Sequence, residues 1–130
     1  MSIQKKIEFF IDCPHKPGEL ARALETLSTA NVNILAFCGY GHGDTASMHF
    51  VVDDDAVATA ALKSARIEFE THRVVAITAG SGPGQGARFA RALADAKINI
   101  EYAYASTSGK GNSTAVFGVR NLEQALKVLG

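Results

Sequence analysis

Two short motifs in this chain each combine a glycine-containing loop with a nearby asparagine, and together they form a repeat. Pro17-Gly18 precedes Asn33-Ile34, and the same steps recur 66 positions later as Pro83-Gly84 and Asn99-Ile100. An amphipathic pattern after each Pro-Gly step predicts a helix, whose N-terminus carries unpaired N–H groups and partial positive charge. Glycine lets a ligand approach that backbone closely. The two loops are therefore candidate sites for a carboxylate or a phosphate.

Each asparagine is expected at the start of the strand that follows the helix. An amide offers both donors and an acceptor, so it can contact the carboxylate and the ammonium of one ligand. A carboxylate-binding loop with an amide nearby describes a site for an α-amino acid. A simpler interpretation stays open, because a duplicated turn, with asparagine ending a helix in a left-handed conformation, would also repeat.

The residues between these motifs repeat without a gap, so about half of the chain is used twice. The matching pairs are Ala21 and Ala87, Arg22 and Arg88, Leu27 and Leu93, and Ala30 and Ala96. We therefore predict two units, residues 1–70 and residues 71–130. Each unit alone would have a thin core, so we expect the units to pack together or with a second chain.

Hydrophobic periodicity predicts the order βαββαβ in the first unit. Its strands are expected at residues 7–12, 32–38, 47–52 and 67–72, and its helices at residues 20–30 and 53–65. The second unit is expected to have strands at 74–79, 98–105 and 114–119, helices at 89–96 and 122–129, and a glycine-rich turn at 108–112. It lacks the last strand, which leaves an edge that a borrowed strand could fill. The predicted fold class is α+β, with two ferredoxin-like units that each form an antiparallel sheet with both helices on one face.

Composition restricts the function classes. Lys and Arg number 13, as do Asp and Glu, so the net charge is near zero and nucleic-acid binding is not expected. No apolar run is long enough to span a bilayer, so no membrane association is expected. The first residues lead into a strand pattern without the apolar region of a signal peptide, so we expect a cytoplasmic protein. Cys13 and Cys38 are expected to be buried thiols in a reducing compartment.

At this spacing the motifs resemble the ACT domain, the amino-acid-sensing module of feedback-regulated biosynthetic enzymes. The resemblance rests on residues 16–21 (Lys-Pro-Gly-Glu-Leu-Ala) with residues 30–35 (Ala-Asn-Val-Asn-Ile-Leu), and on residues 82–84 with residues 96–100. The second unit departs from the pattern, since Gly80-Ser81-Gly82 replaces charged residues and Gly86 stands where Leu20 stood. The two candidate sites are therefore not expected to be equivalent.

The resemblance implies units that pair side by side through sheet edges and bind amino acids at the interface. For this chain it implies a regulator that acts on a partner enzyme, or a sensor. We expect a homodimer because sheet edges and thin cores need cover. No residue pattern suggests catalysis, so no catalytic residue, cofactor or metal is expected. Gly18 and residues 84–86 would hold the carboxylate, Asn33 and Asn99 the polar head, and His15 or Glu19 would adjust the first site. The full set of expected contacts is Asp12, His15, Lys16, Pro17, Gly18, Glu19, Leu20, Asn33 and Ile34, with Ser81, Gly82, Pro83, Gly84, Gln85, Gly86, Asn99 and Ile100.

A dinucleotide site is the first alternative. Gly82, Gly84 and Ala87 fit the G-x-G-x-x-G/A fingerprint between a strand and a helix, and Glu101 follows 19 residues after Gly82, near the position of a ribose-binding acid. Glu101 falls inside a predicted strand, however, and too few residues remain after it for a second helical crossover.

Two further alternatives remain. Metal-ligating side chains are present (Cys13, His15, Cys38, His42, His49 and His72), but their spacing matches no zinc motif, so we expect scattered histidines and packed thiols. Asp53, Asp54 and Asp55 are expected to cap a helix, where acids favour the N-terminal dipole. A protein-interaction module that binds no small ligand also stays open, and it predicts dimerisation alone.

Overall fold

The helices that follow the two Pro-Gly steps have the same length, and each begins at the residue after the glycine. In the computed structural model, which describes residues 1–107, 109 and 111–130, α1 spans Glu19–Thr29 and α3 spans Gln85–Asp95. Both ends of α3 therefore lie 66 positions after those of α1. The N-cap glycines, Gly18 and Gly84, have φ angles of 95° and 83°, in the left-handed region that glycine adopts without steric cost. The sequence repeat is a repeat of structure.

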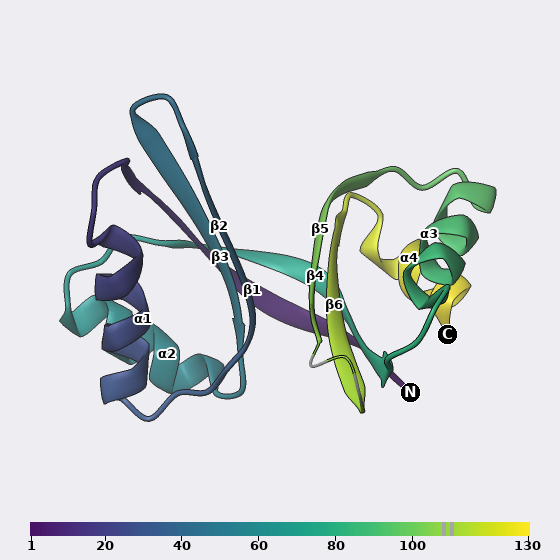
Figure 1. Ribbon diagram of the computed structural model, residues 1–130, viewed down its shortest axis with the longest axis horizontal. Coiled ribbons are helices and arrows are strands. Elements are labelled where there is room, and N and C mark those ends of the chain that lie inside the picture. Colours follow the sequence, from purple (N-terminus) through teal and green to yellow (C-terminus); the bar gives the residue numbers. More distant parts are fainter. Residues whose placement is uncertain (108, 110) are drawn as a thin grey trace. The chain divides into compact units, whose positions relative to one another are not determined.

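The first of two compact units is Ile7–His72. It contains most of β1 (Ser2–Pro14), α1, β2 (Ile34–His42), β3 (Thr45–Val52), α2 (Asp55–Ser64) and the start of β4 (Glu70–Gly80). Its strands lie in the order β2-β3-β1-β4, with β3 antiparallel to both β2 and β1. Both helices cover one face of these strands (Figure 1) and enclose a core that includes Phe9, Leu27, Phe50 and Leu62.

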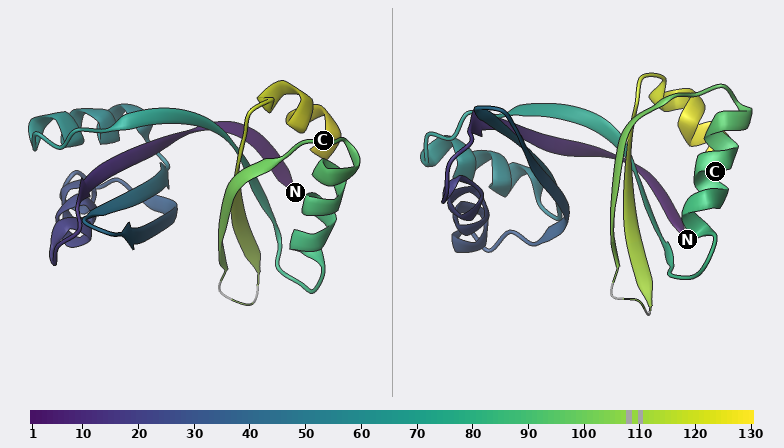
Figure 2. Two further views of the ribbon diagram at one scale, coloured as in Figure 1. Left: turned by 90° about the horizontal axis from the view of Figure 1, so that it is seen from above. Right: turned by 45° about the horizontal axis from the view of Figure 1, so that its top comes forward.

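The second unit joins Met1–Lys6 to Arg73–Gly130. It contains most of β4, α3, β5 (Ile100–Thr107), β6 (Asn112–Val119) and α4 (Leu122–Leu129), with strand order β1-β4-β6-β5. Strand β6 is antiparallel to β4 and to β5. In the views of Figure 2, α3 and α4 again lie on a single face of their strands. The core of this unit includes Val75, Phe89, Leu93 and Phe117. The predicted fold class, two ferredoxin-like units with antiparallel strands, is confirmed.

The N-terminal residues supply the strand that the second unit lacks. Strand β1 begins at Ser2, five residues before the predicted start, and its first residues belong to the second unit, where β1 is the neighbour of β4. Ile3 packs against the core of that unit. The borrowed strand is thus an extension of β1, which the mostly polar stretch Gln4-Lys5-Lys6 concealed.

Other boundaries also differ from the prediction; α3, for example, was expected at residues 89–96 and begins at Gln85. Residues 67–69 are not in a strand, and β4 runs without a break through the junction where two strands were expected.

Asp54 is the N-cap of α2, and its Oδ1 accepts a hydrogen bond from the Val57 N–H at 3.1 Å, so the acidic cluster caps the helix as expected. Of the turn predicted at 108–112, Ser108 and Lys110 lie outside the described residues. None of the described helices has the length and apolar character needed to cross a membrane.

Candidate functional site

The loop between β1 and α1 is held against the β2–β3 hairpin. The His15 N–H donates to the Asp44 carbonyl at 2.8 Å, and the Lys16 N–H donates to the Pro14 carbonyl at 3.0 Å. The His15 imidazole lies directly over Gly41, since a Cβ at Gly41 would overlap the ring. Among the described residues no side chain caps the N-terminus of α1. The backbone N–H groups that begin this helix are therefore not occupied by a cap.

A cavity of about 340 Å³ lies between this loop and the hairpin. On the loop side its lining is His15, Lys16, Pro17, Gly18, Glu19 and Leu20, and on the hairpin side it is Gly39, Tyr40, Gly41, Ala46, Ser47 and Met48. The structure thus brings together six of the nine contacts expected in the first unit. The hairpin residues were not among the predicted contacts, because their positions depend on how β2 and β3 pair.

Charge at the cavity is mixed. Lys16 Nζ lies 3.6 Å from Glu19 Oε1, so a cation and an acid stand side by side at its rim. Burial raises the pKa of the nearby Cys13 thiol, and the negative charges of Glu19 and Asp12 raise it further. Both cysteines are half-buried and free, not fully buried as expected. The site can therefore offer both a positive and a negative group to a zwitterion.

Asn33 lies far from this cavity. It precedes β2, whereas the cavity contacts β2 at Gly39 and Gly41, about 20 Å further along an extended strand. In Figure 1 the β1–α1 loop lies at the upper end of the first unit and the start of β2 at the lower end. Asn33 instead exchanges hydrogen bonds with Asp53, donating its N–H to Asp53 Oδ1 and accepting the Asp53 N–H, both at 3.0 Å.

The other expected contacts of the first unit also lie outside the cavity. Ile34 packs against the core. Asp12 is exposed, and its Oδ1 accepts a hydrogen bond from Ser47 Oγ at 3.4 Å. Within one unit, therefore, the loop and the start of β2 do not form a single site.

Polar groups of the glycine-rich loop in the second unit already have hydrogen-bond partners within that unit. The Ser81 N–H donates to the Gly111 carbonyl at 2.7 Å, and Ser81 Oγ lies 3.0 Å from Thr107 Oγ1. Gln85 Nε2 donates to the Gly80 carbonyl at 3.0 Å. Gly82, Pro83, Gly84 and Gly86 are exposed. As in the first unit, Ile100 packs against the core, and Asn99 lies at the opposite end of the unit's second strand from the loop.

The family model that describes an ACT domain pair matches residues 1–129. The chain belongs to the ACT domain pair family. No significant match was found among curated proteins. Among solved structures, this ACT pair is similar to protein BT0572 from Bacteroides thetaiotaomicron, with 25% identity, a TM-score of 0.86, and coverage of 98% of this chain and 88% of that one.

Two aspartate kinase structures share the fold of the ACT pair. The regulatory subunit of aspartate kinase from Thermus thermophilus, in a ligand-free form, is 21% identical with a TM-score of 0.68, covering 98% of this chain and 93% of that one. A structure of aspartokinase alpha and beta subunits is 22% identical with a TM-score of 0.69, covering 99% and 95%.

The ACT topology removes the context that a dinucleotide site needs. Strands β4 and β5, which flank the 82–87 loop and its helix, are not neighbours, because β6 lies between them and is antiparallel to both. The fingerprint belongs instead to a βαβ unit of a parallel sheet. Glu101 lies inside β5 and forms an ion pair with Arg120 at 2.9 Å. The fingerprint match in the second ACT unit is therefore a loop of small residues.

Two of the four histidines, His49 and His72, meet at one carboxylate in the first ACT unit, so the expectation of scattered histidines is wrong for these two. The register pairs Phe10 and Cys38 with His49, and Tyr40 with Ser47. The buried Glu8 contacts two rings through Oε1, at 3.1 Å from His49 Nδ1 and 3.3 Å from His72 Nδ1. His42 Nε2 lies 3.1 Å from Ser47 Oγ. No group among the described residues has the arrangement needed to hold a metal ion.

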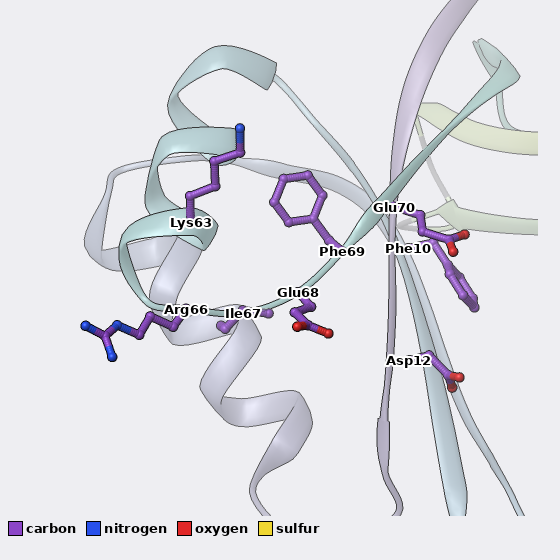
Figure 3. A pocket seen from close by; sticks show the side chains of 8 residues that line it. All are labelled: Phe10, Asp12, Lys63, Arg66, Ile67, Glu68, Phe69 and Glu70. Carbon is purple, nitrogen blue, oxygen red and sulfur yellow. The ribbon is translucent and has the colours of Figure 1, made fainter.

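A second hollow of the first ACT unit, about 710 Å³, lies between β1 and the segment that enters β4. Figure 3 shows Lys63 and Arg66 on the helix side and Phe10, Asp12 and Glu70 on the strand side. Ile67, Glu68 and Phe69 complete the lining. The charged ends point in different directions and do not converge, so we assign no ligand to this hollow.

Proposed function

We propose that this chain is a regulatory protein that binds a small amino acid at the cavity between the β1–α1 loop and the β2–β3 hairpin. The observation that carries the proposal is the cavity itself, at about 340 Å³ beside a helix N-terminus that no side chain caps. This volume is at the lower end of the range of about 300–1,000 Å³ found for ligand sites. A small ligand is therefore favoured.

The lining suits the two charges of an amino acid. The N–H groups that begin α1, with Lys16 beside them, would bind the carboxylate. Glu19, whose side chain is only 20% exposed, would bind the ammonium. Leu20, Ala46 and Met48 give the remaining wall an apolar character, so a short side chain would lie there.

A second copy of the chain would complete the site. Strand β2 is at the edge of the strand order in its unit, and Phe37 on β2 is 48% exposed. Antiparallel pairing of β2 with β2 of a second copy would bring Asn33 of that copy towards Gly39 and the loop. This arrangement supports a homodimer and gives Asn33 the role in ligand binding that the distance within one unit prevents.

The regulated partner in this proposal is an enzyme of amino-acid biosynthesis in the cytoplasm, and the chain itself is not an enzyme. Its family and its fold, shared with an aspartate kinase regulatory subunit, support a regulatory role. The second loop would be the weaker site, since Ser81 already bonds to Gly111 and Thr107, and Gln85 to the Gly80 carbonyl.

Calorimetry and thermal shift with each common amino acid at millimolar concentration test the proposal. Gly39→Ala is the decisive variant, because its new methyl group would meet only Leu20 and the Ser47 carbonyl, at 3.9 Å, and would take up cavity space without a clash. Gly80→Ala is the matched control, because no atom lies within 4 Å of a Cβ at that position. We expect one amino acid to bind, Gly39→Ala to weaken it and Gly80→Ala to leave it unchanged. Binding of none by the folded protein would favour the ligand-free interaction module.

Mixing two defective variants tests the shared site. In a heterodimer of Gly39→Val with Asn33→Ala, one site carries both changes and the other carries neither. We expect each variant alone to bind poorly and the mixture to regain binding. Absence of recovery in a mixture shown to exchange subunits would contradict the shared site while leaving the single-unit cavity open.

A further inference from the structure

A polar cavity of about 470 Å³ lies at the start of β5, at the opposite end of this strand from the glycine-rich loop. Six polar residues line it: Lys97, Asn99, Glu101, Arg120, Asn121 and Gln124. Two cations and one acid leave the lining with an excess positive charge. Asn99 was expected to act with the loop, but the structure places it here instead.

Arg120 is held by the described residues through one nitrogen only, which leaves the rest of its guanidinium group available to bind an anion. Its Nε contacts Glu101 Oε1 at 2.9 Å, and its side chain is 90% exposed. A pair made through Nε leaves the two terminal NH₂ groups free to bind a carboxylate or phosphate in a fork. Lys97 forms no ion pair with any described residue, so its charge is also available.

The start of α4 adds to the positive potential. Asn121 is the N-cap of α4, and it is fixed by two hydrogen bonds to Gln124: its Oδ1 accepts the backbone N–H at 3.1 Å and its Nδ2 donates to Oε1 at 3.2 Å. Arg120 also borders a neighbouring hollow lined by Arg73 and by Glu123, whose carboxylate pairs with Lys5 at 3.6 Å. The partial positive charge at the N-terminus of α4 and the Arg120 side chain therefore lie at the same corner of the unit.

The first unit provides an internal comparison, because its equivalent corner has the opposite charge. Ile34 pairs with Val52 as Ile100 pairs with Val119, so Asp53 occupies the position that Arg120 has in the second unit. The Asp53 carboxylate accepts a hydrogen bond from the Asn33 N–H, so an acid occupies that corner. Leu35 stands where the second unit has Glu101. The repeat has thus diverged towards a cationic corner in one copy only.

We propose that this corner of the second unit binds a small oxyanion, a carboxylate or a phosphate, through Arg120 and Lys97, with the Asn99 amide as a further donor. The ligand differs from the zwitterion proposed for the first unit, and the site shares no residue with that cavity. The inference therefore stands independently of the proposed amino-acid site.

Amide NMR titrations of the full chain test this proposal. The probes are sodium phosphate, sodium acetate and, as the reference anion, sodium chloride, at constant ionic strength. We expect phosphate or acetate to shift amides of residues 97–101 and 120–124, and not those of residues 15–20. Binding of phosphate alone identifies a phosphate site, binding of acetate alone identifies a carboxylate site, and binding of both supports a general oxyanion site.

Two arginine variants separate this site from general charge effects. Arg120→Gln should weaken binding roughly fivefold, as expected for an exposed charged contact. Arg91→Gln is the matched control, because Arg91 is 76% exposed in the same unit and pairs with Asp95 at 3.7 Å, outside the cavity. An equal loss in both variants, or shifts no larger than those with chloride, would overturn the proposal.

Discussion

Glu8 is a buried acid among the strands of the first unit. Its carboxylate is fully buried, and both His49 and His72 contact it through Nδ1. Phe10 lies against the same two rings, with centroids 5.0 and 5.4 Å away. Removing a buried partner leaves polar groups without compensation, which costs more than an exposed pair is worth.

We therefore expect Glu8→Ala to lower the free energy of unfolding by about 3 kcal/mol. Glu68→Ala, at an exposed position of the same unit, should change it by less than about 0.5 kcal/mol. Urea unfolding followed by circular dichroism measures both. Glu8→Gln should fall between them, because it keeps an acceptor but loses the charge. Equal stability of Glu8→Ala and Glu68→Ala would show that the histidine contacts contribute nothing.

Cys13 allows the electrostatics beside the cavity to be measured. Burial raises the pKa of its thiol, with further contributions from Glu19 and Asp12, so the folded protein holds this proton to higher pH than the unfolded chain. The stabilisation is complete below the thiol pKa of the unfolded chain and is lost as pH rises through the folded pKa. Since the thiolate is the nucleophile, Cys13 should alkylate slowly at pH 8.

The expected result is faster alkylation of Cys13 by iodoacetamide in Asp12→Asn and in Glu19→Gln than in the unmodified chain. Each change removes a negative charge that raises the pKa, and mass spectrometry of the Cys13 peptide gives the rate. Glu68→Gln serves as the control, because Glu68 is not among the groups that raise this pKa. Unchanged rates in both test variants would leave burial as the only cause.

The residues that could be predicted for the site were those adjacent in sequence. Gly18 and Lys16 belong to a recognisable loop, and both line the cavity. Gly39 and Met48 could not be predicted, because their positions depend on how β2 and β3 pair across the hairpin. The same dependence on register concealed the contact between Glu8 and His49, which are 41 residues apart.

At the scale of single elements, three helices end on a residue other than glycine in the left-handed conformation. Asn31, Arg66 and Lys97 have φ angles of 60°, 58° and 60°. After α2, for example, the Ile67 N–H donates to the Leu62 carbonyl and the Arg66 N–H to the Lys63 carbonyl, both at 3.0 Å, as in a Schellman motif. Glycine usually occupies this position because a Cβ is unfavourable there.

Arg66→Gly should therefore stabilise the protein by about 0.5–1 kcal/mol. Lys63→Gly, only three residues earlier but inside α2, should destabilise it by about 1 kcal/mol because glycine is a poor helix former. Asn31→Gly should give the smallest gain, because asparagine tolerates this conformation better than arginine does. Thermal unfolding of the three variants measures these effects. Destabilisation by Arg66→Gly would mean that lost side-chain contacts outweigh the relief of strain.

The helices were more predictable than the strands that separate them. The apolar stripe after each glycine predicted both α1 and α3, although α3 begins at Gln85 and not at residue 89 as expected. Strands β1 and β4 were underestimated, because each extends through both units and their polar stretches carry no clear alternation. A half-buried residue such as Ile3 acquires its role from a unit that is distant in sequence.

At the scale of the whole molecule, this arrangement makes the second unit depend on the first residues of the chain. Met1–Lys6 belongs to the same compact unit as Arg73–Gly130. Ile3 contacts the core of that unit, which includes Val75 and Phe117. We expect Ile3→Asp to destabilise the second unit by about 2 kcal/mol, because it places a charge beside that core. Gln4→Asp, at the adjacent exposed position, should have little effect.

Amide hydrogen exchange resolves this prediction unit by unit. In Ile3→Asp, protection of Val75, Ile77 and Phe117 should fall, whereas protection of Phe9 and Phe50 in the first unit should fall less, because local stability follows the packing around each amide. Gln4→Asp should leave both sets unchanged. An equal loss in both sets would show that the two units unfold as one cooperative body. No loss in either would show that the second unit is stable without the packing of Ile3.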